Sequence, residues 1–230
     1  MIECIVENEK DAIAAEKLGA IRLELVSAIQ LGGLTPSLGI IKRTMENLQI
    51  PVQIMVRPHN YGFNYDAFDK EAMMEDINLL YDLGYYRIVV GALDQNRKID
   101  TNFLDYIFKE FPLLNVTFHR AFDEVEDQME AYRTLVSYRD NIKRVLTSGG
   151  AESCLAGAIN LRNLVQLQHE LNGPVIMPGN GMKLENIKEL HNTVQADEYH
   201  FGSGVRKHLS YEEGFDKKVI EGIKHILSDR

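Results

Sequence analysis

The chain is poor in cysteine and has no long apolar run, and both absences restrict what it can be. Its 230 residues include only two cysteines, Cys4 and Cys154, with no CxxC pair and no zinc-ligand spacing. We interpret both as small buried hydrophobic residues and expect no disulfide between them. No apolar run approaches the ~18 residues that a membrane span needs. The amino terminus lacks the basic and apolar regions of a signal peptide, so we expect a cytoplasmic protein.

Basic charge is also scarce. The chain has 25 Lys and Arg residues against 34 Asp and Glu residues, which gives a formal net charge of −9. The acidic residues are dispersed, and no basic stripe or basic arm is present. We therefore expect neither nucleic acid nor an anionic membrane as a partner.

Short β-branched runs alternate with longer amphipathic stretches eight times along the chain. Eight β/α units in a chain of this length predict a single-domain α/β protein over residues 1–230, a (β/α)8 TIM-type barrel. The lack of a Rossmann glycine fingerprint argues against a doubly wound open sheet. The expected strands are 2–6, 21–25, 52–56, 87–90, 116–119, 144–146, 175–177 and 198–201.

Helical patterns separate these strands. Thr35 is expected to cap one helix, with Pro36 at its first position. Asp123 and Glu126 form a capping box at the start of another. The expected helices are 11–18, one opening at 35, 68–83, 100–111, 123–138, 151–171, 183–193 and 214–227, the last within a C-terminal helix and tail over 206–230.

Charged side chains recur on one face of these strands. In residues 21–25, for example, Arg22 and Glu24 alternate with apolar residues. The apolar faces must contact the outer helices, so the polar faces point into the barrel lumen, where charges need partners. The network is either a self-paired structural interior or a functional site at the carboxyl ends of the strands. The expected lumen residues are Glu3, Arg22, Glu24, Gln53, Arg57, Thr117, His119, Glu198 and His200.

Two sets of residues would then meet at the carboxyl-end mouth of the barrel. Residues 116–123 run from a buried strand into His119 and Arg120. Three glycine-bearing loops follow the sixth, seventh and eighth strands, and their amides could hold a phosphate or carboxylate. We expect an anion to be bound by Arg57, Arg120, Ser148, Gly149, Gly181 and Ser203.

The same inventory supports proton transfer. His119 or His200 would move a proton, because imidazole titrates near neutrality, and Glu24 or Glu198 would act as a base or orient the histidine. Asp123 is interpreted as a helix cap only. Lyase, isomerase and hydrolase chemistry all fit. Glu24, His119 and His200 could instead hold a divalent ion, whose identity is left open.

Several motifs resemble the CutC family of copper homeostasis proteins. In order they are Gly19-Ala20 with Arg22 and Glu24-Leu25, 32–37 (GGLTPS), Arg57-Pro58, 116–123 (VTFHRAFD), 146–149 (LTSG), and the late Glu198 and His200. The resemblance covers residues 2–205. It implies a (β/α)8-type barrel, a cytoplasmic location, frequent homo-oligomers and a role in copper handling.

The chain departs from the family pattern at two positions that bear on copper. Family members commonly carry cysteines where this sequence has Ile5 and Val26, and Cys4 lies on the opposite strand face. Because Cu(I) prefers thiolate and thioether ligands, a family-type thiolate site cannot be assembled here. Two hypotheses follow. One is a copper-binding protein without catalysis, and the other is an enzyme that acts on a small anionic or phosphorylated metabolite.

Overall fold

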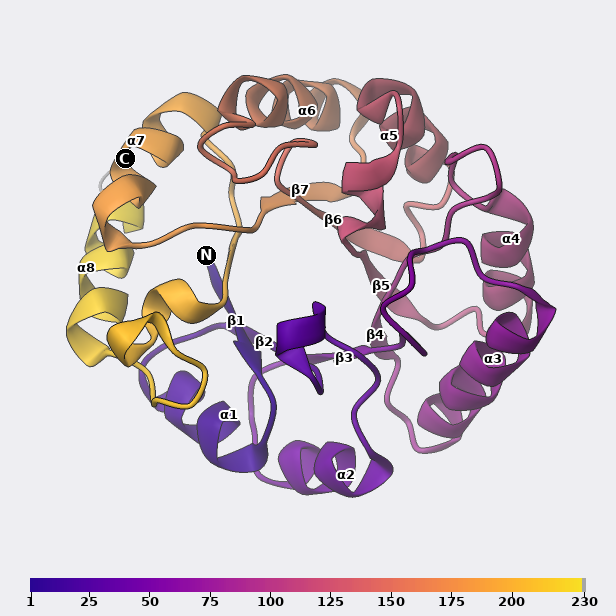
Figure 1. The fold of residues 1–230 in the computed structure, drawn as a ribbon, viewed down its shortest axis with the longest axis horizontal. Coiled ribbons are helices and arrows are strands. Elements are labelled where there is room, and N and C mark those ends of the chain that lie inside the picture. Colours follow the sequence, from indigo (N-terminus) through magenta and orange to yellow (C-terminus); the bar gives the residue numbers. More distant parts are fainter. Residues whose placement is uncertain (229–230) are drawn as a thin grey trace.

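The computed structural model describes residues 1–228, which form eight parallel strands surrounded by eight helices. Figure 1 shows helices α1 to α8 in a ring around the strands, in chain order. The strands are β1 (Ile2–Val6), β2 (Arg22–Leu25), β3 (Val52–Met55), β4 (Arg87–Val90), β5 (Asn115–Phe118), β6 (Ile142–Thr147), β7 (Val175–Pro178) and β8 (Tyr199–Phe201). The helices are α1 (Glu9–Lys17), α2 (Leu38–Glu46), α3 (Ala67–Asp82), α4 (Thr101–Glu110), α5 (Gln128–Val136), α6 (Ala158–Leu171), α7 (Leu184–Val194) and α8 (Lys217–Ser228).

The strands pair in the order β7-β6-β5-β4-β3-β2-β1-β8, and an isolated parallel bridge between Gly179 and His200 joins the two ends. The predicted TIM-type barrel is therefore confirmed. All eight strands lie within about two residues of their expected places, because an alternation of apolar and polar residues is a local property of the sequence. No helix within residues 1–228 has the length and apolar character needed to cross a membrane.

The apolar residues of the strands and helices form one large core between the barrel and its outer ring. A second, smaller cluster of Ile5, Val26, Met55 and Val89 lies apart from that core. Every expected polar lumen residue is buried; these are Glu3, Arg22, Glu24, Gln53, Arg57, Thr117, His119, Glu198 and His200. The prediction that both cysteines are buried is also confirmed.

Several helix starts were predicted wrongly. Ser37, not Thr35, caps α2, and its hydroxyl accepts the Ile40 N–H at 3.4 Å. The Thr35 hydroxyl instead accepts the Arg57 N–H at 2.9 Å, which joins the loop after β2 to the end of β3. Thr35 is of a type that is favourable at a helix N-cap, but here it makes a tertiary contact instead.

The expected capping box at Asp123 is also wrong. Residues Arg120–Glu124 form a 3₁₀ turn, and Asp127 caps α5 by accepting the N–H groups of Met129 and Glu130. Helix α6 begins at Ala158 rather than 151, because the preceding segment folds back on the loop after β6. There, a Cβ built on Gly157 would lie 2.0 Å from the carbonyl oxygen of Ser148.

Candidate functional site

Beneath the mouth of the barrel, two arginines and two glutamates neutralise one another. Arg22 forms ion pairs with both Glu3 and Glu198, and the Arg144 Nε lies 2.9 Å from the same Glu198 oxygen. Strand register explains the contacts, since Glu3 is the neighbour of Arg22 on β2 and of His200 on β8. The predicted charge network therefore exists. The network also contains Arg144, which the sequence analysis did not identify. Arg144 shares a strand face with Leu146, which lines the cavity described below.

Above that layer, His200 lies between two carboxylates. Its Nδ1 is 2.7 Å from Glu3 Oε1, and its Nε2 is 3.5 Å from Glu24 Oε2. Burial alone would lower the pKa of His200, but Glu24 and Glu3 outweigh burial and raise it. Burial would raise the pKa of Glu3, yet Arg22 and His200 lower it to about 2.

Glu24 differs from Glu3. Burial raises the pKa of Glu24 to about 7, against the opposing attraction of His200. Its Oε1 is buried and has no hydrogen-bond partner among the residues described. A carboxyl group that titrates near neutrality and retains an unused oxygen is suited to exchange a proton with a ligand.

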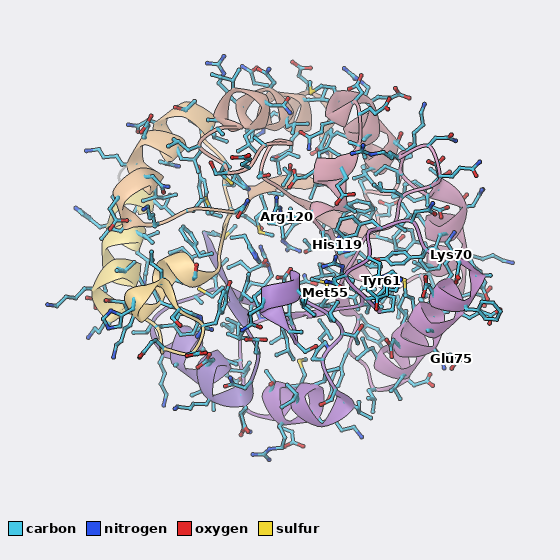
Figure 2. All side chains as sticks on the ribbon, viewed as in Figure 1. Met55, Tyr61, Lys70, Glu75, His119 and Arg120 are labelled. Carbon is cyan, nitrogen blue, oxygen red and sulfur yellow. The ribbon has the colours of Figure 1, made fainter. Side chains whose placement is uncertain are left out.

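A cavity of about 640 Å³ opens at the carboxyl ends of the strands. Its wall contains Glu24, His119 and His200 together with apolar side chains such as Met55. Figure 2 shows Met55, His119 and Arg120 toward the middle of the ring, with Glu75 outside it. This lining agrees with the prediction that polar residues of several strands meet at the carboxyl-end mouth of the barrel.

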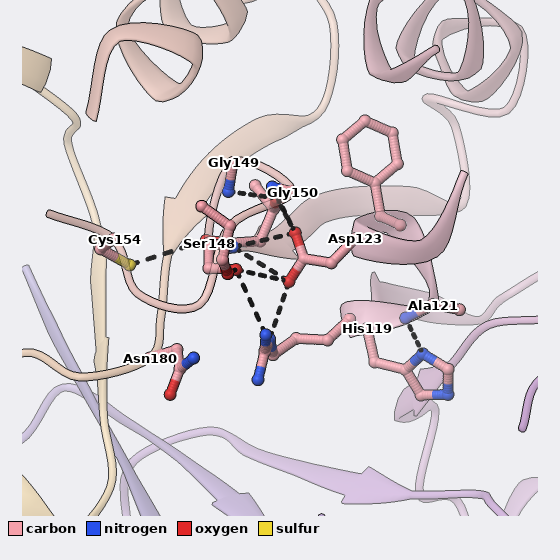
Figure 3. A network of polar contacts seen from close by, with 12 residues as sticks. His119, Ala121, Asp123, Ser148, Gly149, Gly150, Cys154 and Asn180 are labelled. Atoms are coloured by element: carbon pink, nitrogen blue, oxygen red, sulfur yellow. Dashed lines mark hydrogen bonds and ion pairs between the residues drawn. The ribbon is translucent and has the colours of Figure 1, made fainter. Parts of the chain in front are cut away.

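His119 directly follows β5 and is almost fully buried. Its Nδ1 accepts the backbone N–H of Ala121 at 3.1 Å, as Figure 3 shows, and its Nε2 has no partner among the described residues. Burial and the positive charge of Arg57 lower the pKa of His119 to about 3. The ring lies 4.8 Å from that of Phe63, and a Cβ on Gly91 would lie 2.6 Å from Nδ1, so a glycine is needed there.

The Arg57 side chain lines the cavity and also forms hydrogen bonds to the backbone of the cavity wall. Its Nη1 donates to the carbonyl oxygens of Leu31, Gly32 and Gly33, at 3.4, 3.3 and 3.3 Å. Both glycines have φ near +85°, a conformation that other residues rarely adopt. Arg57 therefore fixes the turn after β2 at the cavity edge, a role that the sequence did not indicate.

The carboxylate of Asp123 lies against the backbone of the loop after β6 (Figure 3). This carboxylate accepts the N–H groups of Ser148 and Gly150 at 3.0 and 3.1 Å, and it also holds the Nε of Arg120 at 2.8 Å. Ser148 and Gly149, which were expected to bind the anion, do not line the cavity. The protein's own carboxylate takes the place that a ligand was expected to take, and Arg120 is held at the rim.

The loops after β7 and β8 also form part of the cavity wall. The predicted residues Gly181 and Ser203 both line it, together with Lys183, which the sequence analysis missed. Glu198 does not line the cavity, because it pairs with the arginines below. His59 follows Pro58 in the loop after β3, and its Nε2 lies 3.0 Å from the Asp69 carboxylate of α3.

Among the residues described, Glu3, Glu24 and His200 offer ligand atoms within 4.8 Å of one another, and His119 is not part of that group. The cysteines lie elsewhere. Cys4 is on β1 and Cys154 is in the segment after β6, and burial raises the pKa of each thiol to about 12. Neither thiol is therefore readily available as a thiolate.

The family model described as the CutC family matches residues 1–205 of the chain. A protein named family protein CutC from Enterobacter sp. (strain 638) is 32% identical over 204 residues, which cover 89% of this chain and 80% of that protein. The human protein named copper homeostasis protein cutC homolog is 36% identical over 201 residues, which cover 87% of this chain and 72% of that protein.

Solved structures agree with the fold. The crystal structure of the copper homeostasis protein CutC from Streptococcus agalactiae has a TM-score of 0.80 at 29% identity, covering 88% of this chain and 97% of that one. Phosphoribosyl anthranilate isomerase from Thermotoga maritima has a TM-score of 0.64 at 13% identity, covering 100% and 98%. At that identity the second likeness concerns the fold alone.

Proposed function

The chain belongs to the CutC family, and we propose that it is an enzyme that moves protons on a small anionic metabolite bound at the barrel mouth. One observation carries the proposal. Glu24 is buried in the cavity wall with a pKa of about 7 and one oxygen that has no partner within the described residues. A purely structural interior would pair that oxygen, as it pairs both oxygens of Glu3.

In this proposal Glu24 is the group that takes and returns the proton. His200 stabilises the ionised form of Glu24 from 3.5 Å, and Glu3 holds His200 in place from the other side. The Arg22 pair below keeps Glu3 ionised. Proton transfer to and from carbon is a step of many isomerases and lyases, so these two classes fit a carboxyl group in this role best.

Three basic side chains in the cavity wall support an anionic substrate, and the acidic Glu24, Asp123 and Glu124 line the same cavity. These basic side chains are Arg57, Arg120 and Lys183, and Lys183 lies in the same loop after β7 as Gly181. Loops after the seventh and eighth strands are where barrels of this fold frequently bind phosphate. The ligand would therefore carry a phosphate or carboxylate near Lys183 and its reacting carbon near Glu24.

Thermal-shift measurements with a library of phosphorylated and carboxylated metabolites test this proposal. A true ligand at about 100 times its Kd should raise the melting temperature by about 5–10 °C. Arg120→Met should reduce that shift. Arg43→Met, which removes an exposed arginine of α2, should leave it unchanged. Glu24→Gln should still bind the ligand but not convert it. A library with no stabilising anion would contradict the proposal.

Copper binding is a second candidate, because two thioethers, those of Met55 and Met182, line the same cavity as His200. Cu(I) prefers such soft ligands, whereas the buried, protonated thiols of Cys4 and Cys154 fit it poorly.

A Cu(I) competition titration should therefore give the same affinity for the native chain and for the double variant Cys4→Ser/Cys154→Ser. If copper binds in the cavity, Met55→Leu/Met182→Leu should weaken it by about tenfold or more. Binding that requires the thiols would favour copper handling through a rearranged site.

We also propose that the protein is cytoplasmic and homo-oligomeric, as the family resemblance implies. Cell fractionation measures the first, and light scattering coupled to gel filtration measures the second.

A further inference from the structure

We propose that His119 is locked as the neutral Nε2–H tautomer and donates that hydrogen to a carbonyl oxygen of the substrate. This inference rests on the proposed function and names the chemical class of its substrate. It assigns His119 neither proton transfer nor metal binding, the two roles that the sequence left open.

The tautomer follows from one backbone contact. The amide of Ala121 can only donate a hydrogen bond, so the Nδ1 that it contacts at 3.1 Å must accept, and Nδ1 therefore carries no proton. A neutral imidazole then carries its proton on Nε2. The contact is local and rigid, because Ala121 lies two residues on, in the 3₁₀ turn that His119 itself precedes.

The surroundings keep the ring neutral. His119 is 3% exposed, has the guanidinium of Arg57 as a cationic neighbour and packs against Phe63, and no carboxylate forms an ion pair with it among the described residues. A proton on Nδ1 would point at the hydrogen of the Ala121 N–H group and be repelled by it. The ring is consequently a poor base, and it cannot offer Nε2 as a lone-pair ligand to a metal without first losing its remaining proton.

That leaves a donor without an acceptor. Both His119 Nε2 and Arg57 Nε are buried and have no partner among the residues described, although both side chains line the cavity. Phe63 brings them together, because its ring lies 4.8 Å from the ring of His119 and 4.7 Å from the Arg57 Cζ. Two unpaired donors, one of them cationic, suit an oxygen on which negative charge develops.

The substrate class follows from combining this donor pair with Glu24. A carboxylate that removes a proton from carbon needs the resulting charge to move to a neighbouring oxygen. A neutral imidazole donor can stabilise that oxygen without giving up its proton, as is known for other barrel isomerases. The substrate is accordingly a carbonyl compound with an acidic C–H next to the carbonyl group and a separate anionic group.

Nuclear magnetic resonance tests the tautomer on the native chain, without a ligand. In ¹⁵N-labelled protein between pH 5 and 8, His119 should show a protonated Nε2, an unprotonated Nδ1 and no titration. His119→Gln assigns the resonances. A proton on Nδ1, or a titration within that pH range, would overturn the inference while leaving the anion-binding proposal intact.

Calorimetry with two probes tests the donor role. 2-Phosphoglycolate carries a planar oxyanion beside its phosphate, and ethyl phosphate lacks it. Phosphoglycolate should bind the native chain about tenfold more tightly, as expected for a hydrogen bond to a charged oxygen. His119→Phe should abolish most of that preference, and His119→Gln should retain part of it through its amide N–H. Equal affinities in the native chain, or an unchanged preference in His119→Phe, would overturn the donor role.

If neither probe bound, the anion site of the proposed function would be contradicted. The tautomer measurement would then decide the protonation state of His119 by itself.

Discussion

Arg22 is the residue on which the buried charges beneath the cavity depend. It forms ion pairs with both Glu3 and Glu198, whereas Arg144 pairs with Glu198 and His200 pairs with Glu3. Glu3 in turn orients His200. A single guanidinium thus connects the floor of the barrel to the proposed reacting groups, through contacts that are all shielded from water.

Replacing this residue should be costly. Arg22→Met leaves Glu3 and Glu198 buried with less compensation, so we expect the free energy of unfolding to fall by about 3–5 kcal/mol. Guanidinium denaturation measures the loss. Arg43→Met removes only exposed ion pairs and should change stability by less than about 1 kcal/mol. Equal stability of the two variants would mean that the network is not stabilised by Arg22.

At the scale of elements, the loop between β6 and α6 is organised by the 3₁₀ turn that follows β5. Asp123 of that turn accepts hydrogen bonds from Thr147, Ser148 and Gly150, and it also accepts the Nε–H of Arg120, which lies at the cavity rim. The two segments lie side by side because β5 and β6 are neighbours in the barrel. The Asp123 carboxylate therefore organises the loop after β6, and Asp123 is itself part of the cavity wall.

Neutralising Asp123 should loosen that loop. In Asp123→Asn, hydrogen exchange at the amides of Ser148 and Gly150 should accelerate by about tenfold or more, the equivalent of one lost hydrogen bond to a charged group. Asp127→Asn is the matched control, because Asp127 caps α5 and contacts Met129 and Glu130 instead. Unchanged protection in Asp123→Asn would show that the loop is held by its own turns.

For the whole molecule, buried titratable groups make stability depend on pH in opposite directions. The pKa of His119 is lowered from 6.5 to about 3, so the unfolded chain binds its proton first and stability is lost as pH falls from 6.5 toward 3. The pKa of Glu24 is raised from 4.5 to about 7, so its contribution is complete below pH 4.5 and is lost as pH rises through 7.

Urea denaturation at a series of pH values should separate the two effects. The stability difference between the native chain and His119→Gln should shift in favour of the variant as pH falls from 7 to 5, since glutamine does not titrate. Against Glu24→Gln, the shift should favour the variant as pH rises from 5 to 8. Parallel stability curves for all three proteins would contradict both pKa directions.

The fold could be predicted because its signals are local. Each strand shows its alternation within three to six residues, and eight such strands separated by helices leave few arrangements other than a barrel. The same alternation placed Glu3, Arg22, Glu24 and His200 in one lumen. Membership of the CutC family, expected from the motifs, was likewise confirmed.

Partners within the site could not be predicted, because they depend on which strands are neighbours and at what register. Only the folded barrel placed Asp123 against the amides of Ser148 and Gly150, and only there did Arg57 reach the carbonyl oxygens of the turn after β2. The sequence by itself determined the barrel and the polarity of its interior. The tertiary structure decided which polar atoms satisfy one another and which, such as Glu24 Oε1 and His119 Nε2, are left for a ligand.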